Sequence, residues 1–147
     1  MTLTTLVIGA GASLRESAIA QALVPGVTCA IILEGLPDGH SVLYGHSVLD
    51  GHRLAPALVP ILARIAPGCL CCTGNLILRV TLNRILRHPP ARLFISLANA
   101  AHVGQLRQWL SQAPYDGLLE LEADMLVQAE HAGEKVLEIG RCSPISV

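Results

Sequence analysis

The stretch "LTTLVIGAGASLRESAIAQALVPGVTCAIIL", residues 3–33, decides the fold class because its hydrophobic pattern changes twice. Residues 3–8 are a short run of aliphatic and β-branched residues, which is typical of a buried strand. The glycine-bearing turn GAGAS follows, and residues 14–23 then show helical spacing that ends before Pro25. Residues 27–33 are a second apolar run. This order of strand, turn, helix and strand predicts a βαβ unit in a parallel sheet with helices on its faces.

The clearest helix is predicted over residues 73–88, with the sequence TGNLILRVTLNRILRH. Thr73 is a plausible N-cap, because its hydroxyl oxygen can accept a hydrogen bond from the first turn. Two prolines directly after residue 88 end the helix. The spacing predicts that one face packs on the core through Leu78, Leu82 and Ile85.

The remaining segments extend the alternation of strands and helices. The pattern predicts a helix over residues 53–65 broken by two prolines, a strand over 91–98, a helix over 102–112, a strand over 117–123, a short helix near Leu126 and a strand over 135–140. We therefore predict a three-layer α/β fold with a mostly parallel sheet of five or six strands and helices on both faces.

Composition excludes several classes of partner. Of the 147 residues 52% are hydrophobic, 14% charged and 3% aromatic, and the formal net charge is -1. Such a chain is not expected to bind nucleic acid, because it has few rings for stacking and no excess of positive charge. No basic leader precedes the first apolar run, and no run approaches membrane-spanning length. We expect one cytoplasmic domain over residues 1–147 with reduced thiols and no membrane partner.

The charges are distributed unevenly along the chain. No acid occurs from Gly51 to Tyr115, and acids dominate from Asp116 onward. The acid-free stretch contains Arg53, Arg64, Arg79, Arg84, Arg87, Arg92 and Arg107. Two interpretations stay open: the arginines lie along helix flanks with their charged ends in water, or they bind an anion or an acidic partner.

Three of the five cysteines lie within four positions of the segment APGCLCCTGN, residues 66–75. Three thiolates can converge on one ion, and with a fourth ligand they make a tetrahedral zinc site. The predicted helix start directly after Cys69, Cys71 and Cys72 favours their thiolate forms. Two alternatives are that the thiols are buried as small apolar side chains, or that two of them form a disulfide.

The fourth ligand is left open between water, Cys29 and the histidines of a Gly-His repeat. The segment DGHSVLYGHSVLDGHRL, residues 38–54, spaces His40, His46 and His52 six residues apart. In an extended chain neighbouring histidines would lie roughly 20 Å apart at about 3.3 Å per residue, so only a fold-back brings two together. The repeat is interpreted either as a loop or as a metal-loading segment.

The cysteine run carries a family resemblance. Gly68-Cys69-Leu70-Cys71-Cys72 matches the GCxCC motif of the CobW-like metallochaperone GTPases, a branch of the P-loop NTPases. The segment RILRHPPARLFISLANAAHVGQL, residues 84–106, is similar to the helix and Walker-B-like strand that follow the motif in that family. The resemblance covers residues 3–123 and implies a P-loop NTPase-like fold.

The phosphate loop departs from the family pattern. In GAGASLRE, residues 9–16, Leu14 replaces the second glycine and is expected to fill the space for the β-phosphate. Arg15 replaces the lysine, Glu16 replaces the magnesium-binding hydroxyl, and Ser96 and Asn99 replace the Walker-B acid and glycine. What the resemblance implies for cofactor binding is a degenerate phosphate loop composed of Gly9, Gly11, Ser13, Arg15 and Glu16.

The resemblance implies a metal-binding protein, a metallochaperone or metal sensor for zinc or a similar divalent ion. The departures imply that GTP hydrolysis is lost, so that the chain is not an active enzyme and is not expected to use GTP. The implied partners are the metal ion and a client metalloprotein, a full-length GTPase relative or a second copy of this chain. Two alternatives stay open: a regulatory pseudo-GTPase that acts as a docking module, and a nucleotide-binding GTPase with an atypical site.

Overall fold

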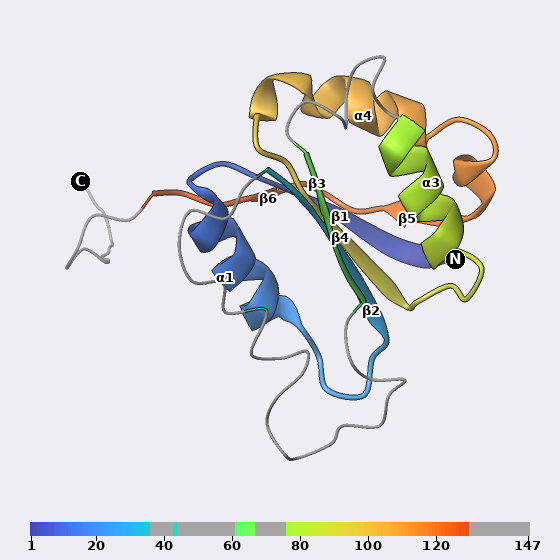
Figure 1. The fold of residues 1–147 in the computed structure, drawn as a ribbon, viewed down its shortest axis with the longest axis horizontal. Coiled ribbons are helices and arrows are strands. Elements are labelled where there is room, and N and C mark those ends of the chain that lie inside the picture. Colours follow the sequence, from blue (N-terminus) through green and yellow to red (C-terminus); the bar gives the residue numbers. More distant parts are fainter. Residues whose placement is uncertain (36–42, 44–60, 67–75, 130–147) are drawn as a thin grey trace, which may run out of the picture.

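The computed structural model describes residues 1–35, 43, 61–66 and 76–129. Strands and helices alternate through these residues (Figure 1). The elements in chain order are β1 (Thr2–Ile8), α1 (Ala12–Ala22), β2 (Cys29–Glu34), β3 (Ile61–Ile65), α3 (Leu76–Ile85), β4 (Arg92–Ser96), η2 (Ala100–His102), α4 (Val103–Leu110), η3 (Tyr115–Gly117), β5 (Leu119–Leu121) and β6 (Met125–Leu126).

The strands form one sheet in the order β3-β2-β4-β1-β5, and β6 also pairs with β1. Every pairing is parallel, which confirms the predicted parallel sheet. The βαβ start is confirmed too, but β1 and β2 are not neighbours, since β4 lies between them. The chain thus returns from the far side of the sheet to place its fourth strand in the centre.

Helices cover both faces of the sheet, so the molecule has three layers (Figure 1). Helix α1 lies on one face, and α3 and α4 lie on the other. Because side chains alternate along a strand, neighbouring residues of β2 and β4 serve different cores. Ile31 and Phe94 belong to the core under α1, while Ile32 and Ile95 belong to the core under α3 and α4.

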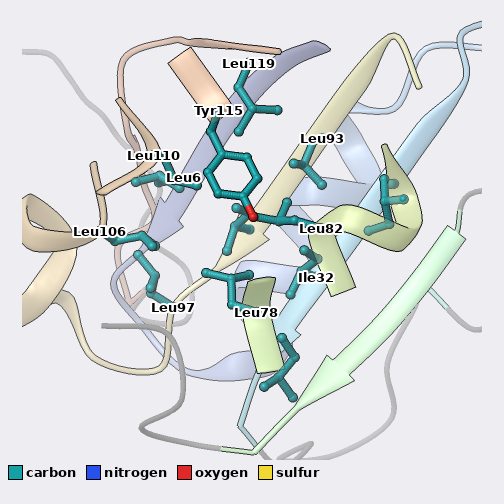
Figure 2. Close-up of a cluster of buried hydrophobic side chains, with 14 residues drawn as sticks. Leu6, Ile32, Leu78, Leu82, Leu93, Leu97, Leu106, Leu110, Tyr115 and Leu119 are labelled. Atoms are coloured by element: carbon teal, nitrogen blue, oxygen red, sulfur yellow. The ribbon is translucent and has the colours of Figure 1, made fainter. Parts of the chain in front are cut away.

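The core under α3 and α4 is almost entirely aliphatic, as the composition requires (Figure 2). Helix α3 contributes the three predicted residues Leu78, Leu82 and Ile85, all buried, which confirms its core face. Tyr115 closes the cluster beside β5, and its hydroxyl donates to Asn83 Oδ1 at 3.1 Å. This bond satisfies the one polar group that the ring carries into the layer.

Two predicted helices are wrong in the described residues. The helix over residues 53–65 is contradicted at residues 61–65, which form β3 and pair with β2 from Ala30↔Ile61 to Glu34↔Ile65. The helix near Leu126 is contradicted because Met125 and Leu126 pair with the end of β1. Both segments are short, so hydrogen bonds offered by a neighbouring strand outweigh their local preferences. Residues 53–60, Thr73 and the strand predicted over 135–140 lie outside the described residues.

Three arginines of the acid-free stretch pair with acids outside it. Arg92 contacts Glu122 at 2.8 Å, and Arg107 contacts Asp124. Arg64 contacts Glu16 at 3.2 Å. The unevenness along the sequence is therefore partly balanced in space, because parallel strands bring the acid-free middle of the chain beside the acidic ends.

Candidate functional site

The candidate site lies at the carboxyl ends of β1 and β4. The chain leaves β1 through α1 on one face of the sheet, and it leaves β4 through η2 and α4 on the other (Figure 1). Open α/β sheets bind ligands outside the carboxyl ends of their strands at such a switch of direction. The turn after β1, which was predicted to be a degenerate phosphate loop, lies at this point.

The turn is held tightly against the following part of the sheet. Gly9 has a φ of +93° and Ala10 a φ of +46°, so two consecutive residues adopt left-handed backbone. A Cβ on Gly9 would overlap the carbonyl oxygen of Val127. Val127 in turn donates its N–H to the Ile8 carbonyl oxygen at 2.8 Å. Glycine is required at position 9 both for its φ and for this close approach.

The Arg15 side chain is buried against the inner side of this turn. Its residue exposure is 4%, and its Nε donates to Ser96 Oγ at 2.8 Å. Its Nη1 donates to the carbonyl oxygens of Gly9 at 3.1 Å and Ala10 at 2.8 Å. The guanidinium therefore ties the turn after β1 to the last residue of β4, and it is hydrogen bonded as a buried charge must be.

Glu16 is also buried, with a residue exposure of 2%. Its carboxylate accepts from Arg64 Nη2 on β3, and Arg64 Nη1 donates to the Gly35 carbonyl oxygen at 3.0 Å. At the same edge Glu34 Oε1 accepts from the Ala98 N–H at 2.8 Å. The carboxyl edge of the sheet thus contains two arginines and two glutamates that contact other groups of the protein.

The predicted phosphate-loop residues lie together in the structure, but the side chains of Leu14 and Arg15 do not point where the sequence analysis expected. Gly9 and Gly11 lie in the turn, where Gly11 is the N-cap of α1, and Ser13 lies in its first turn. Leu14 was expected to fill the turn, but it lies on the outer face of α1 and is 37% exposed. One residue further round the helix, Arg15 takes the inward position.

The cysteine run 69–72 and the three histidines of the Gly-His repeat lie outside the described residues. The chain enters the segment that contains the run from the carboxyl end of β3 and leaves it into α3. Of the candidate ligands only Cys29 is described. Among the described residues no three His, Cys, Asp or Glu side chains are grouped as a metal site would require.

Cys29 is a buried free thiol at the amino end of β2, opposite to the end where Ile65 finishes β3. Burial raises the pKa of this thiol to about 11, and the positive charge of Arg92 opposes the rise. The thiol is protonated at neutral pH, whereas metals bind the thiolate. Both features weigh against Cys29 as the fourth ligand, and the ligand set itself stays a prediction.

Sequence reasoning missed the partners of the two charged residues. Ser96 was noted only as a replacement for an acid, and Arg64 only as one of several arginines. The 2.8 Å hydrogen bond from Arg15 Nε to Ser96 Oγ joins two positions that the sequence analysis had considered only separately. Nothing in the sequence marked Arg64, whose pairing with Glu16 depends on β3 being a strand.

The chain matches no protein-family model, no curated protein and no solved structure. No helix in the described part of the chain is long and apolar enough to cross a membrane.

Proposed function

We propose that this protein binds zinc or a similar divalent ion through Cys69, Cys71 and Cys72 and acts as a metal carrier or sensor. Thiolates suit soft and borderline ions, and exchange of thiolate ligands allows such an ion to be passed to a client protein. The proposal includes the loss of GTP hydrolysis that the degenerate phosphate loop implies.

The observation that carries the proposal is where the flanking residues lie. Ile65 ends β3 at the carboxyl edge of the sheet, and Leu76 begins α3. The cysteine segment therefore starts from the edge where open α/β sheets bind their ligands. The resemblance to the GCxCC motif supports the same assignment from the sequence.

The contacts of Arg15 and Glu16, which follow the turn after β1, support the loss of GTP hydrolysis. Hydrolysis of GTP relies on a lysine and a magnesium-binding hydroxyl that face the phosphates. Here Arg15 binds the turn and Ser96, and Glu16 binds Arg64. Both residues that replace the catalytic pair are engaged inside the protein.

Replacement of Cys69, Cys71 and Cys72 by serine should weaken zinc binding by about 100-fold or more, since neutral hydroxyls are poor substitutes for thiolate ligands. Competition with a chromophoric chelator, on protein kept reduced, measures the affinity. Cys142→Ser removes one thiol outside the run and should leave the affinity unchanged. Equal zinc binding by the triple variant, or no binding tighter than micromolar by the natural protein, would contradict the proposal.

A second candidate function, self-docking, is favoured by two exposed patches of opposite charge. The basic patch on α3 and the turn after it consists of Leu76, Ile77, Val80, Arg84 and Arg87. The acidic patch consists of Asp116 in η3 and Leu118 directly after it. Within the described residues none of these three charged side chains makes an ion pair.

The residue after α3 and the acidic patch share one depression of the surface. Leu86, just after α3, and Leu118 line the same depression of about 460 Å³. Ile77 and Val80 are 48% and 50% exposed, and Leu118 is 42% exposed. A two-fold axis between two copies would let each basic patch meet the other's acidic patch, which is how a self-complementary dimer closes. The occupant that we propose for this surface is therefore a second copy.

Charge reversal tests this dimer. Arg84→Glu and Asp116→Arg should each give monomers by light scattering, because each places like charges opposite one another. An equimolar mixture of the two variants should restore dimers, since both contacts then join opposite charges. Arg79→Glu is the matched control on the same helix, because Arg79 lies over the Trp109 ring, outside the basic patch. A natural protein that is monomeric, or variants that dimerise alone, would remove this candidate.

A further inference from the structure

The groups around the Arg15 guanidinium have the opposite polarity to a phosphate cradle. It donates hydrogen bonds to the carbonyl oxygens of Gly9 and Ala10 and to the hydroxyl oxygen of Ser96. All three accept hydrogen bonds from the guanidinium. A phosphate loop binds its ligand through N–H donors and a positive charge, whereas these oxygens attract a cation that donates.

The positions of these three acceptors are set by the backbone and the sheet. The carbonyl groups of Gly9 and Ala10 are oriented by two successive left-handed residues, and Val127, just after β6, donates its N–H to the Ile8 carbonyl oxygen directly before the turn. Ser96 is 2% exposed and ends the central strand β4. The acceptors therefore belong to the turn and to β4, and their positions are set by the sheet and not by Arg15.

The arrangement and polarity of these acceptors select one chemical class. A guanidinium is planar and presents donors in a fixed fork, which matches acceptors that converge from two strand ends. The carboxylate of the next residue, Glu16, is buried and pairs with Arg64. Phosphate groups would meet the three acceptor oxygens, which repel them.

We propose that the acceptors at the carboxyl ends of β1 and β4 form a guanidinium-binding site that Arg15 fills within the same chain. The site is consequently closed to nucleotides in the natural protein. When the Arg15 side chain is removed, the site takes a guanidinium compound from solution. This inference rests on residues other than the cysteine run, so it stands or falls separately from the proposed metal binding.

The test uses Arg15→Ala and ethylguanidinium, which has the atoms that the substitution removes. Low millimolar ethylguanidinium should raise the melting temperature of the variant saturably by about 2–4 °C, because a ligand that binds only the folded state stabilises it. Guanidinium should give a smaller rise. Urea, which has a similar shape but no charge, and sodium chloride should give none. The natural protein and Leu14→Ala, a change at the exposed neighbouring residue, should not respond.

Two outcomes overturn the proposal: no saturable rise for Arg15→Ala with ethylguanidinium, or a rise with GTP or ATP and magnesium. The second result would show that the site binds phosphate groups. If Arg15→Ala does not fold unaided, its refolding from urea is followed with and without ethylguanidinium. Recovery only with ethylguanidinium supports the site, and failure in both conditions contradicts it.

Discussion

Replacement of Gly9 by alanine is expected to lower the free energy of unfolding by about 3 kcal/mol. Two effects add. The φ of +93° is unfavourable for any residue with a Cβ, and that Cβ would overlap the Val127 carbonyl oxygen. Because the obstructing atom belongs to the backbone of the segment after β6, the end of the sheet has to move. Urea unfolding of the two proteins, analysed by linear extrapolation, gives the difference.

Gly26 supplies the matched control for this experiment. Its φ of +84° is similar, but a Cβ there would meet nothing within 4 Å. Gly26→Ala should therefore cost only the backbone term of about 1 kcal/mol. Equal losses of unfolding free energy for the two variants would show that the close approach of Gly9 to Val127 does not add to the cost of a Cβ at position 9.

Replacement of Phe94 by alanine is expected to cost about 4 kcal/mol. Phe94 is the only phenylalanine of the chain and is completely buried in the centre of β4. Its ring packs in the cluster that α1 covers, and the Arg92 guanidinium lies 4.8 Å from the ring centroid. Truncation would leave a large cavity, because strands on both sides fix the neighbouring side chains.

The same denaturation measurement serves for Phe94, with Val24→Ala as its control. Val24 is 50% exposed, so its truncation should change the free energy of unfolding by less than about 0.5 kcal/mol. A loss below about 2 kcal/mol for Phe94→Ala would mean that the layer under α1 repacks around the cavity, and that it is less tightly packed than the burial indicates.

The local pattern was sufficient for the elements with many periodic residues. The face of α3 that carries Leu78 and Leu82 was predicted because a helix repeats its core contacts every three or four residues. The strands β1, β2 and β4 were predicted because each is a compact aliphatic run between turn signals. These patterns depend only on residues that are close in sequence, so they can be recognised in a single sequence.

The candidate site was predicted only in part. The turn after β1 was identified by its glycines, and the structure shows that position 9 requires one. The direction of Arg15 was not predicted, because a helix start offers several directions and the choice depends on where acceptors lie. Those acceptors include Ser96, which is 81 residues away along the chain.

The sequence by itself determined a parallel α/β sheet, its first βαβ unit and the core face of α3, because hydrophobic burial acts on patterns a few residues long. Tertiary structure alone decided that residues 61–65 are a strand, that β4 separates β1 from β2, and that Glu16 pairs with Arg64. The reason is physical. Short strands and buried charges are stabilised by hydrogen bonds and ion pairs to distant partners, and those partners exist only when the sheet has formed.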